Sequence, residues 1–210
     1  MSMNSKGQSL VDFEPAEPAS TRRSLLGAAG LAGLVGTAAA VLSSTPAAAA
    51  PDLPTDADRD LLAAALGLEL AAVELYKTAA GNLAEDFAAI AEIMAEQHEA
   101  YADSIAGVTG ASSAGRANSD VVDQLSDAFA TSDPQEFGAV ARTLENIAVA
   151  THTELLGTYD SVDAIGLTAS IITVESRHAA VLTSLAGFAA NLDEMLGNTA
   201  DALSLTGGAS

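Results

Sequence analysis

The chain has 210 residues, 49% of them apolar, and a formal net charge of −20. Its length predicts one domain with a hydrophobic core, and its acidity argues against nucleic acid or an anionic membrane surface as a partner. There is no cysteine, which excludes disulfides, thiolate metal sites and cysteine nucleophiles.

The first 50 residues are predicted to be an export signal. Arg22 and Arg23 precede a Gly/Ala/Leu-rich segment that reaches Leu42, and a row of small residues follows from Ala47 to Ala50. This order resembles a twin-arginine signal that is cleaved among those alanines. A permanent membrane anchor is the alternative, but the many glycines of the segment would make a poor one. We therefore expect export of the folded protein to the periplasm, the cell wall or the extracellular space, without stable membrane association after cleavage.

An all-α fold is expected for the rest of the chain. Five of the six prolines lie at or before Pro54, and Pro134 stands where a helix would begin. Alanine and leucine dominate after that point, and alternating apolar and polar runs are absent. These features predict an antiparallel four-helix bundle over residues 51–187, followed by a short helix and a flexible tail over residues 188–210.

The first two long helices each place one ligand-type residue on a buried face. The first is expected over residues 55–80, where Glu69 falls on the apolar stripe and Glu74 does not. The second is expected over residues 83–107, with His98 on its buried side. The solvated face of this second helix is expected to carry Glu92, Glu96 and Glu99.

A long link then leads to the third helix. Glycine, serine, alanine and asparagine dominate residues 107–119, and a short helix is expected over residues 120–130. This link is the only place where the chain could cross the length of a bundle. The third helix is expected over residues 134–159, with Glu145 and His152 facing inward, two turns or about 10 Å apart.

The fourth long helix is expected over residues 163–185. Glu175 and His178 stand three residues apart on it. Residues at this spacing lie on one face of a helix, so this E-x-x-H pair projects two ligand-type groups in the same direction.

Taken together, the inward-facing polar residues include all three histidines of the chain. They are Glu69, His98, Glu145, His152, Glu175 and His178. Buried carboxylates are strongly destabilising unless a cation offsets them, and only five of the eight lysines and arginines lie after residue 50. Oxygen and imidazole ligands suit iron, manganese or zinc, so the set predicts a metal-binding site.

Four segments are similar to exported ferritin-like domain proteins of bacteria. They read ALGLELAAVELY (65–76), MAEQH (94–98), LENIAVAT (144–151) and VESRHAAVL (174–182). The resemblance covers about residues 57–187. It implies a ferritin-like bundle with a long connection, containing a short helix, between the second and third long helices. It also implies a metal centre built from one Glu on each of two helices and an E-x-x-H pair on each of the other two.

The resemblance assigns ligands residue by residue, and it has one departure. Ala95 stands where the second bridging glutamate is implied. The implied ligands are Glu69, His98, Glu145, Glu175 and His178. Three alternatives stay open at Ala95: His152 compensates as an added ligand, the site holds one metal, or it holds none. The ligands imply a centre with one or two iron ions, or manganese or zinc, and Fe(II) oxidation or a peroxide-related reaction if two ions fit.

Two other functions remain open from the sequence. One is a non-catalytic structural or stress-associated ferritin-like protein, in which Arg142 pairs with Glu145 and Glu–His hydrogen bonds satisfy the other buried groups. The second is a helical interaction module whose acidic surface meets basic partners. A homo-oligomer is compatible with each of these functions.

Overall fold

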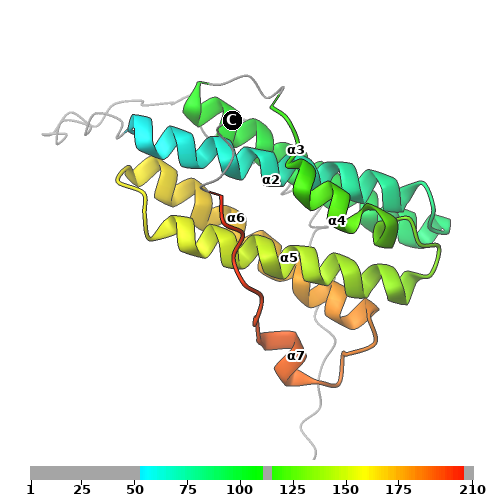
Figure 1. Cartoon of the computed structure of the whole chain (residues 1–210). Coiled ribbons are helices and arrows are strands. Elements are labelled where there is room, and N and C mark those ends of the chain that lie inside the picture. Colours follow the sequence, from blue (N-terminus) through cyan, green and yellow to red (C-terminus); the bar gives the residue numbers. More distant parts are fainter. Residues whose placement is uncertain (1–52, 111–114, 206–210) are drawn as a thin grey trace, which may run out of the picture. The chain divides into compact units, whose positions relative to one another are not determined.

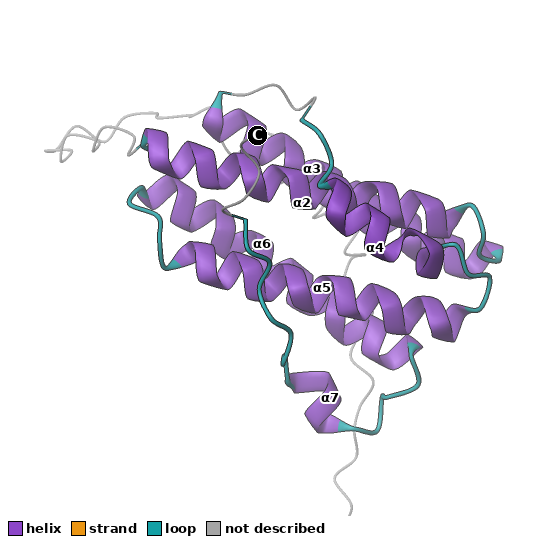
Figure 2. Ribbon diagram, viewed as in Figure 1, coloured by secondary structure: helices purple, strands orange, loops and turns teal. Residues whose placement is uncertain are grey.

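The computed structural model describes residues 53–110 and 115–205. The signal predicted over residues 1–50 lies outside these ranges, so cleavage and export stay predictions. The described residues form helices and no strand (Figure 1; Figure 2), which confirms the predicted all-α fold. None of these helices combines the length and apolar character needed to cross a membrane. The helices are α2 (Asp56–Ala80), α3 (Glu85–Thr109), α4 (Ser119–Phe129), α5 (Pro134–Leu156), α6 (Val162–Leu185) and α7 (Leu192–Leu196).

The four long helices form an antiparallel bundle made of two hairpins, α2 with α3 and α5 with α6 (Figure 1). The Asp58 carboxylate, in the first turn of α2, accepts hydrogen bonds from the backbone N–H groups of Asp160 and Ser161, at 2.9 and 3.2 Å. Both donors lie in the loop that joins α5 to α6. The start of α2 is therefore fixed against the end of α5, and these two helices run in opposite directions.

Local sequence signals explain where the helices begin and end. Thr55 and Asp58 form a reciprocal capping box at the start of α2, and Asp133 caps α5 with Pro134 in its first turn. The end predicted for the second long helix is wrong by two residues, because Gly107 stays helical. Gly110 ends α3 instead, since its φ of 70° lies in the left-handed region that favours glycine.

The core consists of two apolar clusters with polar residues between them. The first cluster includes Leu75, Tyr76, Ala91, Met94, Ala95, Phe129, Phe137 and Leu182. The second includes Leu62, Ala65, Ala102, Ile105, Leu155, Ala164 and Ile171. On both α3 and α6, the segment between the two clusters carries the ligand-type residues. The bundle therefore presents a polar layer within an otherwise apolar core.

Two further segments pack beside α2 and α5. Helix α4 packs against both helices, and the Asn118 N–H donates to the backbone oxygen of Gly67 at 2.8 Å. Residues 198–205, where the sequence predicts a flexible tail, lie along α5 instead (Figure 1). The Leu203 N–H donates to Thr151 Oγ1 at 2.9 Å, and the Leu203 side chain packs on the first apolar cluster. Apolar contact and backbone hydrogen bonding thus hold this segment on the bundle.

Candidate metal centre

The six ligand-type residues predicted from the sequence are all buried and all lie in the polar layer of the bundle. Five of them are at most 1% exposed, and His178 is 6% exposed. Helix α2 supplies Glu69, α3 supplies His98, α5 supplies Glu145 and His152, and α6 supplies Glu175 and His178. The spacing of seven residues on α5 and of three on α6 keeps the two ligand-type residues of each helix on one face. On all four helices this face is turned toward the core.

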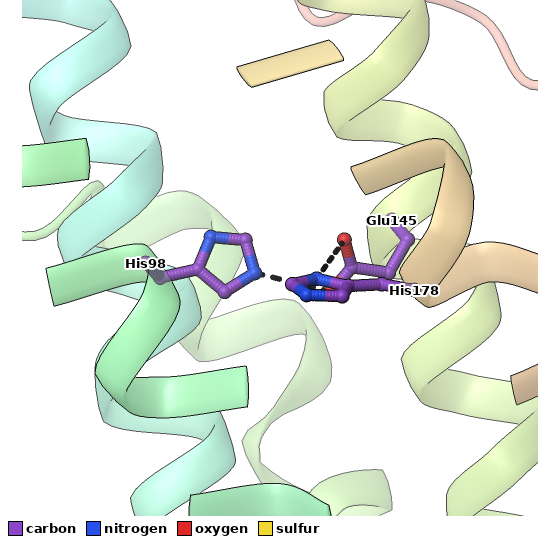
Figure 3. A group of neighbouring side chains, drawn as sticks. All are labelled: His98, Glu145 and His178. Atoms are coloured by element: carbon purple, nitrogen blue, oxygen red, sulfur yellow. Dashed lines mark hydrogen bonds and ion pairs between the residues drawn. The ribbon is translucent and has the colours of Figure 1, made fainter. Parts of the chain in front are cut away.

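His98, Glu145 and His178 form the first of two groups of three, named here the His–Glu–His group. Their side chains converge from α3, α5 and α6 (Figure 3). His98 Nε2 lies 3.1 Å from Glu145 Oε1, and His178 Nδ1 lies 3.3 Å from Glu145 Oε2. One potential ligand atom from each residue lies within 4.8 Å of the other two, so a single ion could contact all three.

Glu69, His152 and Glu175 form the second group, named here the Glu–His–Glu group. His152 Nε2 donates to Glu69 Oε1 at 2.9 Å and lies 3.4 Å from Glu175 Oε1. Here too, one potential ligand atom from each residue lies within 4.8 Å of the other two. His98 Nδ1 donates to Glu69 Oε2 at 2.7 Å, so His98 links the two groups into one continuous centre.

Two carboxylates and two imidazoles of the centre balance one another's charge. They belong to Glu69, Glu145, His98 and His152. Burial alone would raise the pKa of Glu69, but hydrogen bonds and charge from His152 and His98 outweigh it and lower the pKa to about 2. The pKa of Glu145 is also lowered to about 2, because His98 and His178 outweigh the effect of burial. Burial opposes charge on the imidazoles too, yet Glu145 and Glu69 raise the pKa of His98 well above its usual value. Two carboxylates are therefore ionised opposite protonated imidazole.

Glu175 is the exception in this balance. Its carboxylate is fully buried, and neither oxygen has a hydrogen-bond partner among the described residues. The nearest donor, His152 Nε2, is already committed to Glu69. Burial, the first cause, and repulsion from Glu69 and Glu145 outweigh the pull of His152 and raise the pKa of Glu175 to about 7. His152 Nδ1 is likewise buried without a partner. A cation fits the unsatisfied Glu175 oxygens.

Two residues of the centre are not among the sequence-predicted ligands. The Tyr76 hydroxyl donates a short hydrogen bond to Glu145 Oε1, and its ring stacks on His98 with centroids 5.5 Å apart. The sequence places Tyr76 on the apolar stripe two turns after Glu69, but a stripe does not show where a hydroxyl points. Gln97 Oε1 accepts a hydrogen bond from His178 Nε2 at 2.8 Å. No sequence signal marks Gln97.

Two further expectations concern residues beside the centre. Ala95 is 3% exposed and belongs to the first apolar cluster, so a methyl group stands on the inward face where the resemblance implies a carboxylate. The pairing of Arg142 with Glu145 is wrong, because Arg142 Nη2 donates to Glu194 in α7. Glu145 is therefore neutralised by histidines alone. The face predicted to be solvated is confirmed as exposed at Glu92, Glu96 and Glu99.

Comparison with known proteins gives one match. A family model described as "Ferritin-like domain" matches residues 57–187. No curated protein and no solved structure matches the chain. The matched range contains the six ligand-type residues and the four long helices except Asp56, the first residue of α2.

Proposed function

The chain belongs to the ferritin-like domain family, and from this premise we propose that it is an exported protein that binds iron at the centre of its bundle. The ligands in this proposal are Glu69, His98, Glu145, Glu175 and His178, with His152 added. The residues of the polar layer have the required chemistry, because carboxylate oxygen and imidazole nitrogen together suit iron, manganese and zinc.

The main support for metal binding is the burial of the Glu175 carboxylate without a hydrogen-bond donor in the described part of the chain. A fully buried carboxylate without a hydrogen-bond donor destabilises a fold unless a charge of opposite sign lies against it. His152 Nε2, 3.4 Å from Glu175 Oε1, already donates to Glu69, so one imidazole does not offset both carboxylates of the Glu–His–Glu group. A bound cation would. Retaining such a residue in the core is readily explained if the protein is selected to hold an ion there.

Iron is favoured over the other metals by the make-up of the His–Glu–His group. Two histidines and one carboxylate are the ligand set of many non-haem Fe(II) sites. Iron bound there supplies one-electron redox chemistry, which suits Fe(II) oxidation or a peroxide-related reaction. The apolar clusters on both sides shield the polar layer from bulk water.

His152 is proposed to take the place of the glutamate that Ala95 replaces. Its Nε2 lies between Glu69 Oε1 and Glu175 Oε1, at 2.9 and 3.4 Å. An imidazole at this position supplies a ligand to the Glu–His–Glu group from α5, whereas the family pattern supplies a carboxylate from α3. The centre thus keeps six ligand-type side chains with a different distribution over the helices.

Export is proposed from the sequence before the bundle. Arg22 and Arg23, the Gly/Ala/Leu-rich segment and the alanines up to Ala50 support a twin-arginine signal. This route carries folded proteins, which suits a protein that takes up its metal before export. Expression with the paired arginines changed to lysine should leave the protein in the cytoplasm if the proposal is right.

Thermal unfolding tests metal binding. Fe(II) added without oxygen, at about 100 times its Kd, should stabilise the native state by about 2.7 kcal/mol. For a domain of this size that corresponds to a rise in Tm of about 5–10 °C, and a chelator should reverse it. Mg²⁺ is the control for general attraction to the acidic surface, because it prefers oxygen ligands and should leave Tm nearly unchanged.

A non-catalytic protein with a degenerate site is the second candidate. It is favoured by the fact that Glu69, Glu145, His98 and His152 satisfy much of their hydrogen bonding with one another. In that case, Tm would be the same with Fe(II) and with the chelator.

A further inference from the structure

The hydrogen bond between Gln97 and His178 joins α3 to α6 at the edge of the polar layer. Gln97 Oε1 lies 2.8 Å from His178 Nε2, whereas His178 Nδ1 points to the other side, 3.3 Å from Glu145 Oε2. An amide oxygen only accepts hydrogen bonds. His178 Nε2 must therefore carry a hydrogen atom and donate it to Gln97.

The consequence concerns the nitrogen that can bind a metal. An imidazole ligand binds through the nitrogen that carries no hydrogen, and the hydrogen bond of the other nitrogen decides which one that is. Because Gln97 holds the hydrogen on Nε2, Nδ1 is the nitrogen that would give up its hydrogen and bind an ion. Nδ1 is the nitrogen that faces Glu145, within the His–Glu–His group.

This is also the place where the centre comes nearest to solvent. The side chain of His178 is 8% exposed, whereas those of His98, His152 and the three glutamates are at most 1% exposed. Gln97 is partly buried beside it. Without an acceptor fixed to α3, His178 could bond to water through either nitrogen or turn its ring, and it would lose its single orientation.

We propose that Gln97 is a positioning residue of the metal centre, which holds the Nε2 hydrogen of His178 and so presents Nδ1 to the metal. The inference rests on the proposed function, because it gives Gln97 a role only if an ion binds. Gln97 touches no ion itself. It acts through His178.

The test compares two substitutions at one position with Zn²⁺ as the probe. Gln97→Leu keeps the size of the side chain and removes the acceptor, so Zn²⁺ affinity should fall about 10- to 100-fold. Gln97→Glu keeps an acceptor oxygen and should retain affinity to within about threefold. Gln124→Leu, the same change at an exposed position on α4, is the control and should have no effect. Competition with a chelating dye measures all four proteins.

Nitrogen NMR of histidine-labelled protein supplies a readout that a purely structural role would not change. In the Zn²⁺-loaded wild type, His178 should show hydrogen on Nε2 and metal on Nδ1, and in Gln97→Leu this pattern should be lost or weakened. Wild type that binds no Zn²⁺ or Fe(II) would overturn the proposed function itself. Wild type that binds, with Gln97→Leu of equal affinity and an unchanged His178 spectrum, would overturn only the role of Gln97. A Gln97→Glu variant as weak as Gln97→Leu would do the same.

Discussion

Replacing Glu175 with Gln is expected to abolish tight metal binding and, at pH 8, to stabilise the metal-free protein by on the order of 2 kcal/mol. In the folded state, burial and neighbouring carboxylates raise the pKa of Glu175 from 4.5 to about 7. Below pH 4.5 the carboxyl is protonated in both states and has no effect. Between pH 4.5 and 7 the unfolded state ionises this carboxyl while the folded state keeps it protonated, so stability falls over this range and stays low above it. Glutamine carries no charge at any pH and avoids that loss.

Urea unfolding of metal-free protein at pH 5 and pH 8 measures the effect. The advantage of Glu175→Gln over wild type should be small at pH 5 and largest at pH 8. Glu74→Gln, at an exposed position of α2, should change neither stability nor metal binding. A Glu175→Gln protein that is less stable than wild type at pH 8 would show that the carboxylate has a partner in the native state. Such a gain in stability with a loss of binding is typical of residues kept for function.

The same change at Glu145 is expected to have the opposite effect on stability, a loss of about 3 kcal/mol at pH 7. Glu145 accepts hydrogen bonds from Tyr76 and His98 and faces His178. Removing its charge leaves the protonated His98 with less compensation in a fully buried position. The folded-state pKa of Glu145 is lowered from 4.5 to about 2. Its stabilising effect is therefore present above pH 4.5 and is lost as pH falls toward 2.

The two variants are best measured side by side, since both replace a buried glutamate by its amide. Urea unfolding of metal-free Glu145→Gln at pH 7 should show a lower free energy of unfolding, while Glu175→Gln at pH 8 shows a higher one. Two effects of the same sign would contradict the division of the centre into balanced residues and one unbalanced carboxylate. Both variants should bind metal more weakly than wild type, because each loses a ligand.

Helical periodicity is enough to predict which ligand-type residues face the core of the bundle. Glu69, His98 and Glu175 lie on apolar stripes, and stripes meet in the core of a bundle. The six ligand-type residues were therefore expected on inward faces, and the structure brings them together. Thr55, Asp133 and Pro134 fix helix starts within one residue, because capping is a local interaction between neighbours in the sequence.

Contacts between residues far apart in the sequence could not be predicted from helical periodicity. The non-catalytic alternative pairs Arg142 with Glu145, three residues away, but Arg142 bonds to Glu194, which lies 52 residues away on α7. The packing of Leu203 on α5 and the bond from His178 to Gln97 are also long-range. Periodicity tells which way a residue faces on its own helix. Periodicity does not tell which atoms of another helix that residue will contact. The division of the six ligand-type residues into two groups depends on those contacts.

The fold shows the surroundings of Ala95, the residue that stands where the resemblance implies a glutamate. Ala95 lies among apolar neighbours in the first cluster. The ligand-type residue that the family pattern lacks, His152, lies on the other hairpin and contacts Glu69. The proposal that His152 takes the place of the missing glutamate rests on this contact.

The amount of iron bound per chain decides whether the polar layer of the bundle holds a metal. The purified protein is loaded with Fe(II) in the absence of oxygen, desalted, and analysed for iron and for protein. We predict at least one iron per chain and at most two, since two groups of three ligands are present, and near-zero iron in Glu175→Gln. Less than a tenth of an equivalent of iron in the wild type would contradict metal binding at this centre.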